Sequence, residues 1–306
     1  MSNKEFKSSA WQTPASAATY DKNTRAAPAV FQLIRHDFFI KYVQRHAAPG
    51  AKILDLGCGS GLVSIALHDL GYRVVSCDVS QAMLDQVAES RGDREFELRV
   101  GSGFEIPAAD GEFDLVLSRM MIQHFVDWPA ILAEKARVVR EGGIVLFDFG
   151  NQEHLDATKP EYDDGKGFPY NNDPAEPESY YAVATEEEMA RQAKRVGLEV
   201  VGISPLGLLL CNGFQWNALK STGIADQNQK LDDLLKSPEA RELLELIELQ
   251  LMPLLPKSVT YGNMTVLRRS ERSKAPGVSK PSVAAEPSGS PKTKSTWRAA
   301  VARLFS

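Results

Sequence analysis

A glycine-rich turn follows the first strongly apolar segment of the chain, and it is the place where the sequence could bind a cofactor. Residues 53–56 are apolar except for Asp55, and they lead into Gly-Cys-Gly-Ser-Gly at 57–61, after which a helical pattern begins. Glycines let the backbone turn sharply and leave room for a ligand to lie against it. The turn therefore predicts a ligand site at the end of a strand.

A second acid indicates which kind of ligand the turn accepts. Asp78 ends the next apolar segment, 17 residues after Gly61, and a carboxylate there can accept hydrogen bonds from both hydroxyls of a ribose. The dinucleotide turn is G-x-G-x-x-G and opens onto a pyrophosphate. This chain instead has G-x-G-x-G, with Asp55 just upstream, where a diphosphate would be repelled. S-adenosylmethionine, which has a ribose and no phosphate, fits this pattern better.

These motifs resemble the class I S-adenosylmethionine-dependent methyltransferases, particularly the group with the ubiquinone and menaquinone C-methyltransferases and many small-molecule O- and N-methyltransferases. The resemblance is close over residues 51–147 and looser over 185–267. It implies a Rossmann-like α/β fold, with a mostly parallel seven-stranded sheet, helices on both faces and helical cap insertions. It also implies S-adenosyl-L-methionine as the cofactor. The cofactor-binding residues that it implies are Asp55, Gly57, Cys58, Gly59, Gly61, Asp78, Val79, Ser102, Gly103 and Phe104.

One position departs from the family pattern. Many relatives have an Asp five residues before the proline that corresponds to Pro107, and that carboxylate binds the adenine amino group. This chain has Ser102 there, whose hydroxyl can also accept a hydrogen bond.

The segment after the fourth predicted strand contains the candidate catalytic residue. His124 lies where the family has the substrate-facing end of the cofactor pocket. Two roles stay open for it: a general base toward an acceptor hydroxyl, or a packing and hydrogen-bonding residue. Arg119 has a similar pair of interpretations, a structural ion pair or an anion clamp. No spacing of His, Cys or Asp residues indicates a metal site.

Short β-rich runs alternate with helix-length amphipathic segments, which is typical of right-handed βαβ crossovers. The predicted strands are 52–56, 73–77, 96–100, 114–118, 144–149, 198–204 and 263–267. The predicted helices are 30–46, 61–70, 81–90, 129–139, 185–196 and an interrupted region over 231–251. Glycines at 142 and 143 are expected to end a helix before the fifth strand.

Composition and charge restrict the class of protein. The 306 residues are 43% hydrophobic and 25% charged, which is typical of a folded soluble domain, and we expect a cytoplasmic protein with reduced thiols. The net charge is -12 before Arg268 and +7 from there onward. An acidic body would repel a phosphate backbone, so we expect no nucleic-acid partner.

We expect three parts: an N-terminal arm over 1–29, a methyltransferase domain over 30–269 and a disordered basic tail over 270–306. Cap or substrate insertions are expected at about 151–184 and 206–258. The arm contains Tyr20 and Asp21, a pair that relatives place in a segment that often closes over the cofactor. The tail ends in an amphipathic segment, 292–306, with a possible role in peripheral membrane or protein contact.

The function that follows is methyl transfer by in-line displacement to a small-molecule or glycan-like acceptor, which releases S-adenosylhomocysteine. Two alternatives remain: a non-catalytic cofactor-binding scaffold or regulator, and an NAD(P)-dependent oxidoreductase.

Overall fold

The computed structural model covers the whole chain, and all of its described residues lie in the compact unit 1–271. The described residues are 12–22, 30–162, 173–175, 180–206, 233–234, 236–256, 258, 260 and 262–271. The tail segment 292–306 and much of the two expected insertions lie outside them, as do Trp11, Arg25 and Cys211.

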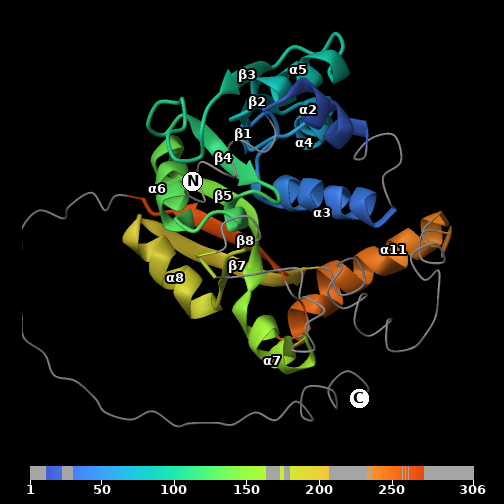
Figure 1. The fold of residues 1–306 in the computed structure, drawn as a ribbon, viewed down its shortest axis with the longest axis vertical. Helices are drawn as coiled ribbons and strands as arrows, with labels where there is room; N and C mark the ends of the chain where they lie inside the picture. Colours follow the sequence, from blue (N-terminus) through green and yellow to red (C-terminus); the bar gives the residue numbers. More distant parts are fainter. Residues whose placement is uncertain are drawn as a thin grey trace, which may run out of the picture. The chain divides into compact units, whose positions relative to one another are not determined.

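The centre of this unit is one sheet of eight strands, which Figure 1 shows with helices around it. Seven strands form the order β3-β2-β1-β4-β5-β8-β7, and the short β6 pairs with β5. The strands are β1 Lys52–Leu56, β2 Arg73–Asp78, β3 Glu97–Val100, β4 Phe113–Ser118, β5 Val139–Asn151, β6 Val183–Ala184, β7 Leu198–Leu206 and β8 Gly262–Arg269. The expectation of a Rossmann-like, mostly parallel sheet is confirmed.

The strand order creates a crevice at one place. β1 pairs in parallel with both β2 and β4, so the chain builds first toward β3 and then back across β1 toward β5. Such a reversal leaves a crevice outside the carboxyl ends of the strands, where open α/β sheets bind ligands. The glycine-rich turn follows β1 and therefore lies at this crevice.

Helices cover both faces of the sheet (Figure 1). Residues of α6 and α8 belong to the apolar cluster on one face, and residues of α3, α4 and α11 belong to the cluster on the other. The helices are α2 Pro14–Asp21, α3 Val30–His46, α4 Leu62–Asp69, α5 Gln81–Ser90, α6 Trp128–Val138, α7 Gln152–Tyr162, α8 Glu186–Arg195 and α11 Pro238–Leu246, with a π-helical turn at Ile247–Leu251.

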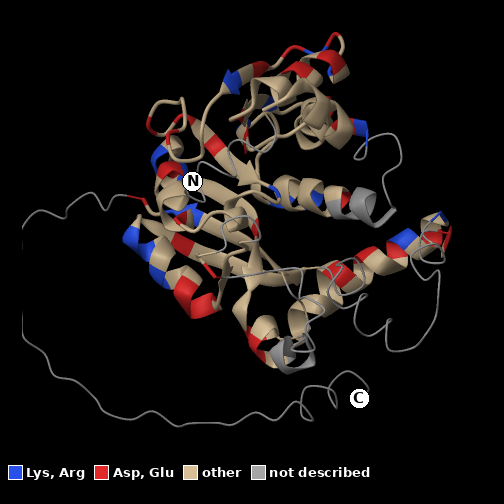
Figure 2. Ribbon diagram, in the orientation of Figure 1, with Lys and Arg blue, Asp and Glu red and all other residues tan. Residues whose placement is uncertain are grey.

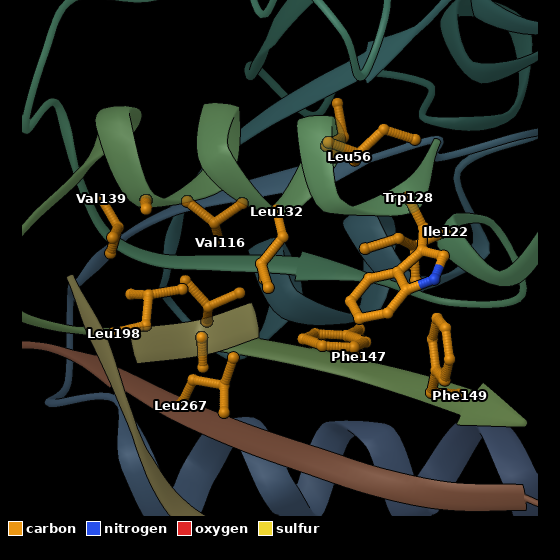
Figure 3. Packing of buried hydrophobic residues seen from close by; sticks show 14 of the residues in the cluster. Leu56, Val116, Ile122, Trp128, Leu132, Val139, Phe147, Phe149, Leu198 and Leu267 are labelled. Atoms are coloured by element: carbon orange, nitrogen blue, oxygen red, sulfur yellow. The ribbon is translucent and has the colours of Figure 1, made fainter. Parts of the chain in front are cut away.

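Apolar side chains make up most of the core between α6 and the sheet. Figure 3 shows Leu132 of α6 beside Val116 and above Phe147. The Trp128 ring lies with its centroid 4.8 Å from that of Phe149. Burial of such side chains stabilises the fold by roughly 1.5–3 kcal/mol each relative to exposure, so α6 is firmly seated on the sheet.

Local sequence signals explain where several helices begin. Three helices begin at a hydroxyl residue that accepts a hydrogen bond from an amide of the first turn. These residues are Ser80 for α5, Thr185 for α8 and Ser237 for α11. α8 is acidic in its first turn and basic in its last, which complements the helix dipole (Figure 2).

Two elements differ from the sequence prediction. β5 begins at Val139 instead of residue 144, because Val139 pairs with Phe113 and residues 140–143 then bulge before pairing resumes at Ile144. A Cβ atom on Gly143 would lie 2.8 Å from the carbonyl oxygen of Asp114, so these glycines serve the bulge and do not end a helix.

The second difference concerns the stretch after β5, where the sequence predicts a cap or substrate insertion at about 151–184 and no helix. Its first part is the helix α7. Asn151 Oδ1 accepts a hydrogen bond from Glu153 N, and Gln152 bonds to Asp156 one turn later. Polar contacts of this kind stabilise the first turns of the helix. They leave no apolar periodicity in the sequence, so the sequence pattern did not predict α7.

Candidate functional site

The turn after β1 has the conformation that its glycines permit. Gly57, Gly59 and Gly61 have φ angles of 71°, 54° and 78°, in the left-handed region. The amides of Gly57 and Cys58 both donate to the carbonyl of Cys77, at 2.8 and 3.1 Å, and tie the turn to β2.

Close neighbours also exclude side chains at two of these positions. A Cβ atom on Gly57 would lie 2.6 Å from Met121 Cγ, and one on Gly61 would lie 2.8 Å from Val87 Cγ1. Gly57 and Gly61 are therefore required by packing as well as by backbone angle.

Asp78 at the end of β2 holds the glycine turn. Its Oδ2 accepts from Gly59 N at 3.0 Å, and its Oδ1 accepts from Ser80 N at 2.9 Å. Burial raises the pKa of this carboxyl, and the backbone hydrogen bonds oppose that shift. The sequence-predicted acid and glycines are thus brought together in one hydrogen-bonded unit.

Asp55 of β1 is almost completely buried next to the turn. It is 2% exposed and accepts from Ser64 Oγ at 2.6 Å, and Ser76 Oγ donates to Ser64 Oγ at 2.7 Å. Burial raises the pKa of Asp55 to about 6. The serine chain anchors β1, β2 and α4 to the same acid.

The N-terminal helix α2 lies over the turn. A Cβ atom on Gly59 would lie 3.3 Å from the Tyr20 ring, and Gln12 Nε2 donates to Val79 O at 3.3 Å. Burial raises the pKa of the Tyr20 phenol, and the Arg119 guanidinium opposes this shift. The pocket at the turn is lined by Tyr20, Asp55, Gly57, Cys58, Ser60 and Arg119, among others.

Cys58 is a poor nucleophile in this position. Its thiol is free, and burial raises its pKa well above the ordinary value, with Asp78 and Asp55 adding to the shift. Its contribution to the pocket is shape.

The segment after β3 forms another wall near the crevice. Ser102 Oγ accepts from Phe104 N at 3.2 Å, so the hydroxyl that could meet an adenine also shapes its own turn. The Phe104 ring contacts that of Phe125 edge to face, with 5.3 Å between centroids. A Cβ atom on Gly103 would lie 3.5 Å from Met121 Cε.

His124 lies in a 3-10 turn after β4, at the same edge of the sheet as the glycine turn. Its ring is half-buried and meets the Tyr181 ring edge to face at 5.6 Å between centroids. Within the described part of the chain, no group of three His, Cys, Asp or Glu residues is arranged to hold a metal ion.

Residues 54–147 match the family described as a methyltransferase domain. This range begins in β1 and ends in β5, and it includes Asp55, the glycine turn, Asp78 and His124. This matched region is similar to the class I S-adenosylmethionine-dependent methyltransferases.

Several curated methyltransferases are similar to this chain. The malonyl-[acyl-carrier protein] O-methyltransferase of Serratia marcescens is 36% identical over 99 residues, which is 32% of this chain and 38% of that protein. The demethylmenaquinone methyltransferase of Corynebacterium glutamicum is 38% identical over 95 residues, 31% of this chain and 40% of that protein. The ubiquinone biosynthesis O-methyltransferase of Thiobacillus denitrificans is 31% identical over 157 residues, 49% of this chain and 65% of that protein.

The matches thus span about two fifths of the first two relatives. Among solved structures, the magnesium protoporphyrin IX methyltransferase of Synechocystis has a TM-score of 0.56 at 11% identity, and the match covers 87% of this chain and 100% of that chain. At this identity the likeness is one of fold.

Two buried titratable side chains were not predicted from the sequence. Lys135 on α6 and Asp148 on β5 are 0% and 2% exposed. Lys135 donates to Ser118 Oγ, and burial lowers its pKa to about 7 while Asp148 and Asp55 oppose that shift. The helical periodicity of the sequence could have indicated that Lys135 is buried, because Lys135 lies on the same face of α6 as Ile131 and Leu132.

No helix among the residues that the structure describes is long and apolar enough to cross a membrane.

Proposed function

We propose that this protein binds S-adenosyl-L-methionine at the glycine turn and transfers its methyl group to a small-molecule acceptor. The observation that supports this most strongly is the unit formed by Asp78, Gly59 and the left-handed turn at the crevice between β1 and β4. The same residues lie inside the region that matches the methyltransferase family.

The residues present fit this cofactor. A carboxylate offers about four acceptor positions, so Asp78 can accept from a ribose hydroxyl in addition to the backbone amides of Gly59, Val79 and Ser80. The pocket beside Tyr20 and Arg119 combines a phenol with a guanidinium, which suits the carboxylate of the methionine portion. Ser102 and Phe104 would border the adenine.

When bound, the cofactor supplies a methyl group on a sulfonium. The task of this chain is then to align the acceptor with the methyl–sulfur bond, because an in-line displacement gains much of its rate from orientation. α2 would cover the turn and exclude water from it, through Tyr20 over Gly59. His124, at the edge of the sheet where the acceptor would lie, would take the proton of a hydroxyl acceptor.

The acceptor class rests on the relatives, whose names refer to demethylmenaquinone, to ubiquinone biosynthesis and to malonyl-[acyl-carrier protein]. We propose that the methyl acceptor is a small molecule with a hydroxyl, a carboxyl or an activated carbon. Glycan-like acceptors are tested in the same experiment. Purified protein would be incubated with methyl-labelled S-adenosylmethionine and panels of quinols, carboxylic acids and glycosides. Label in any of these products supports the proposal, whereas S-adenosylhomocysteine binding without turnover of any panel supports the scaffold alternative.

With a substrate in hand, His124 can be tested separately. His124→Gln keeps a hydrogen-bonding side chain of similar reach and removes the base. If His124 is the base, kcat falls by about 10²-fold or more, with the acidic limb of the pH profile lost. Unchanged kcat in His124→Gln assigns the residue to packing against Tyr181.

The basic tail remains a separate proposal from the sequence. We propose that residues 271–306 tether the enzyme to an anionic membrane surface through the amphipathic segment 292–306. Full-length and Ser270-truncated protein would be sedimented with anionic vesicles at low salt. Sedimentation of the full-length protein alone supports the tether, and both proteins in the supernatant contradict it.

A further inference from the structure

The turn after β4 has an unusual backbone. Met120 has a φ of 51°, and it is the one non-glycine residue with a positive φ among those that the structure describes. A side chain in this region crowds the neighbouring carbonyl, so bulky residues rarely adopt it without support from their surroundings.

A buried carboxylate supplies that support. The Met120 amide donates to Asp148 Oδ1 at 2.7 Å, and Asp148 is 2% exposed. A hydrogen bond to a carboxyl oxygen is stronger in a buried site than in water. A second and weaker contact runs from Gln123 Nε2 to Met120 Sδ at 3.5 Å.

The next residue connects this turn to the cofactor pocket. Met121 packs so closely on the glycine turn that a Cβ atom on Gly57 would lie 2.6 Å from its Cγ. The far end of the same side chain faces Gly103, where a Cβ atom would lie 3.5 Å from its Cε. Met121 therefore touches the turn after β1 and the segment after β3, the two segments that would border the cofactor.

We propose that Asp148 is a positioning residue for cofactor binding. Its carboxylate holds Met120 in the left-handed conformation, and this backbone conformation sets Met121 against Gly57 and Gly103 before the cofactor arrives. The inference rests on the proposed function, since it assigns Asp148 a part in forming the same pocket.

A double-mutant cycle tests the proposal. Glycine adopts a positive φ without help, so Met120→Gly should make the carboxylate dispensable. The four proteins are the wild type, Asp148→Ala, Met120→Gly and the double variant, each titrated with S-adenosylhomocysteine by calorimetry and unfolded in denaturant. We expect Asp148→Ala to weaken binding about tenfold and the double variant to bind within about threefold of Met120→Gly.

A neighbouring substitution provides the control. Met121 has an ordinary φ of -126°, so Asp148→Ala combined with Met121→Gly should show no rescue. Equal weakness of the Asp148→Ala single variant and the Asp148→Ala/Met120→Gly variant, in folded protein, overturns the proposal. If Asp148→Ala alone does not fold, restored folding in the double variant supports the proposal and continued failure overturns it.

Different results contradict the proposed function and the role of Asp148. A wild-type protein that does not bind S-adenosylhomocysteine contradicts the proposed function, and the role of Asp148 falls with it. Wild-type binding without rescue by Met120→Gly contradicts only the role of Asp148.

Discussion

The amide of Gly59 donates a 3.0 Å hydrogen bond to Oδ2 of Asp78, which joins the turn after β1 to the acid that ends β2. The other carboxylate oxygen of Asp78 accepts from Ser80, the residue that caps α5. One side chain thus fixes the glycine turn and the start of a helix, and it is also the side chain for which we propose ribose binding.

Asp78→Ala should reduce the affinity for S-adenosylhomocysteine by on the order of 2–4 kcal/mol, because hydrogen bonds to a charged group are worth about 1.5–3 kcal/mol each. Calorimetry measures the change. Asp69→Ala is the control: Asp69 is an exposed acid paired with Arg94, and its loss should leave the affinity unchanged. Normal binding by a folded Asp78→Ala variant would remove Asp78 from the site.

Gly61→Ala should destabilise the fold more than Gly71→Ala does. Gly61 and Gly71 both have left-handed φ angles, 78° and 85°. A Cβ atom on Gly61 would lie 2.8 Å from Val87 Cγ1, whereas a Cβ atom on Gly71 would have no neighbour within 4 Å. Gly71→Ala should therefore cost about 1–2 kcal/mol of backbone strain, and Gly61→Ala about 1–3 kcal/mol more from overlap.

Denaturant unfolding separates the two terms. Adding Val87→Ala to Gly61→Ala should relieve the overlap and leave the strain, after correction for Val87→Ala alone. Equal free energies of unfolding for Gly61→Ala and Gly71→Ala would mean that Val87 moves freely and that packing does not require this glycine.

Asp55 should make the stability of the protein depend on pH. Burial raises its pKa to about 6 from 3.8, so the folded state binds the proton more tightly than the unfolded state. The stabilisation from this proton is complete below about pH 4 and is lost as the pH rises through 6. Asp55→Asn removes the titration, so its free energy of unfolding relative to wild type should rise by on the order of 3 kcal/mol from pH 4 to pH 7.

The measurement is the unfolding free energy of both proteins at several pH values. Asp69→Asn gives the opposite sign, because Arg94 lowers the pKa of Asp69 and its stabilising effect is lost as the pH falls. A wild-type and Asp55→Asn difference that does not vary with pH would show that the pKa of Asp55 is the same in the folded and the unfolded protein.

The parts of the fold that could be predicted are those in which neighbours in sequence define the structure. The strand, the glycine turn and the helix that follow one another from Lys52 to Asp69 are one continuous pattern, and the acid of the next strand has a fixed place in it. The parallel pairing of β1 with β2 then places Asp78 next to Gly59, so this contact needs no tertiary partner outside the pattern.

The parts that were missed depend on tertiary contacts. The early start of β5 depends on Val139 meeting Phe113, and the conformation of Met120 depends on Asp148, 28 positions away. The residues next to Val139 and Met120 in the sequence do not indicate that Phe113 and Asp148 are their partners. A charged residue inside an apolar strand, such as Asp148, is nevertheless a sign that a buried polar group needs a partner.

We propose that the glycine turn and Asp78 bind S-adenosylmethionine and its product and not a dinucleotide. Calorimetric titration of the purified protein with S-adenosylhomocysteine, and separately with NAD, tests it most directly. We predict micromolar binding of S-adenosylhomocysteine and weaker or undetectable binding of NAD. Tighter binding of NAD than of S-adenosylhomocysteine would contradict the account.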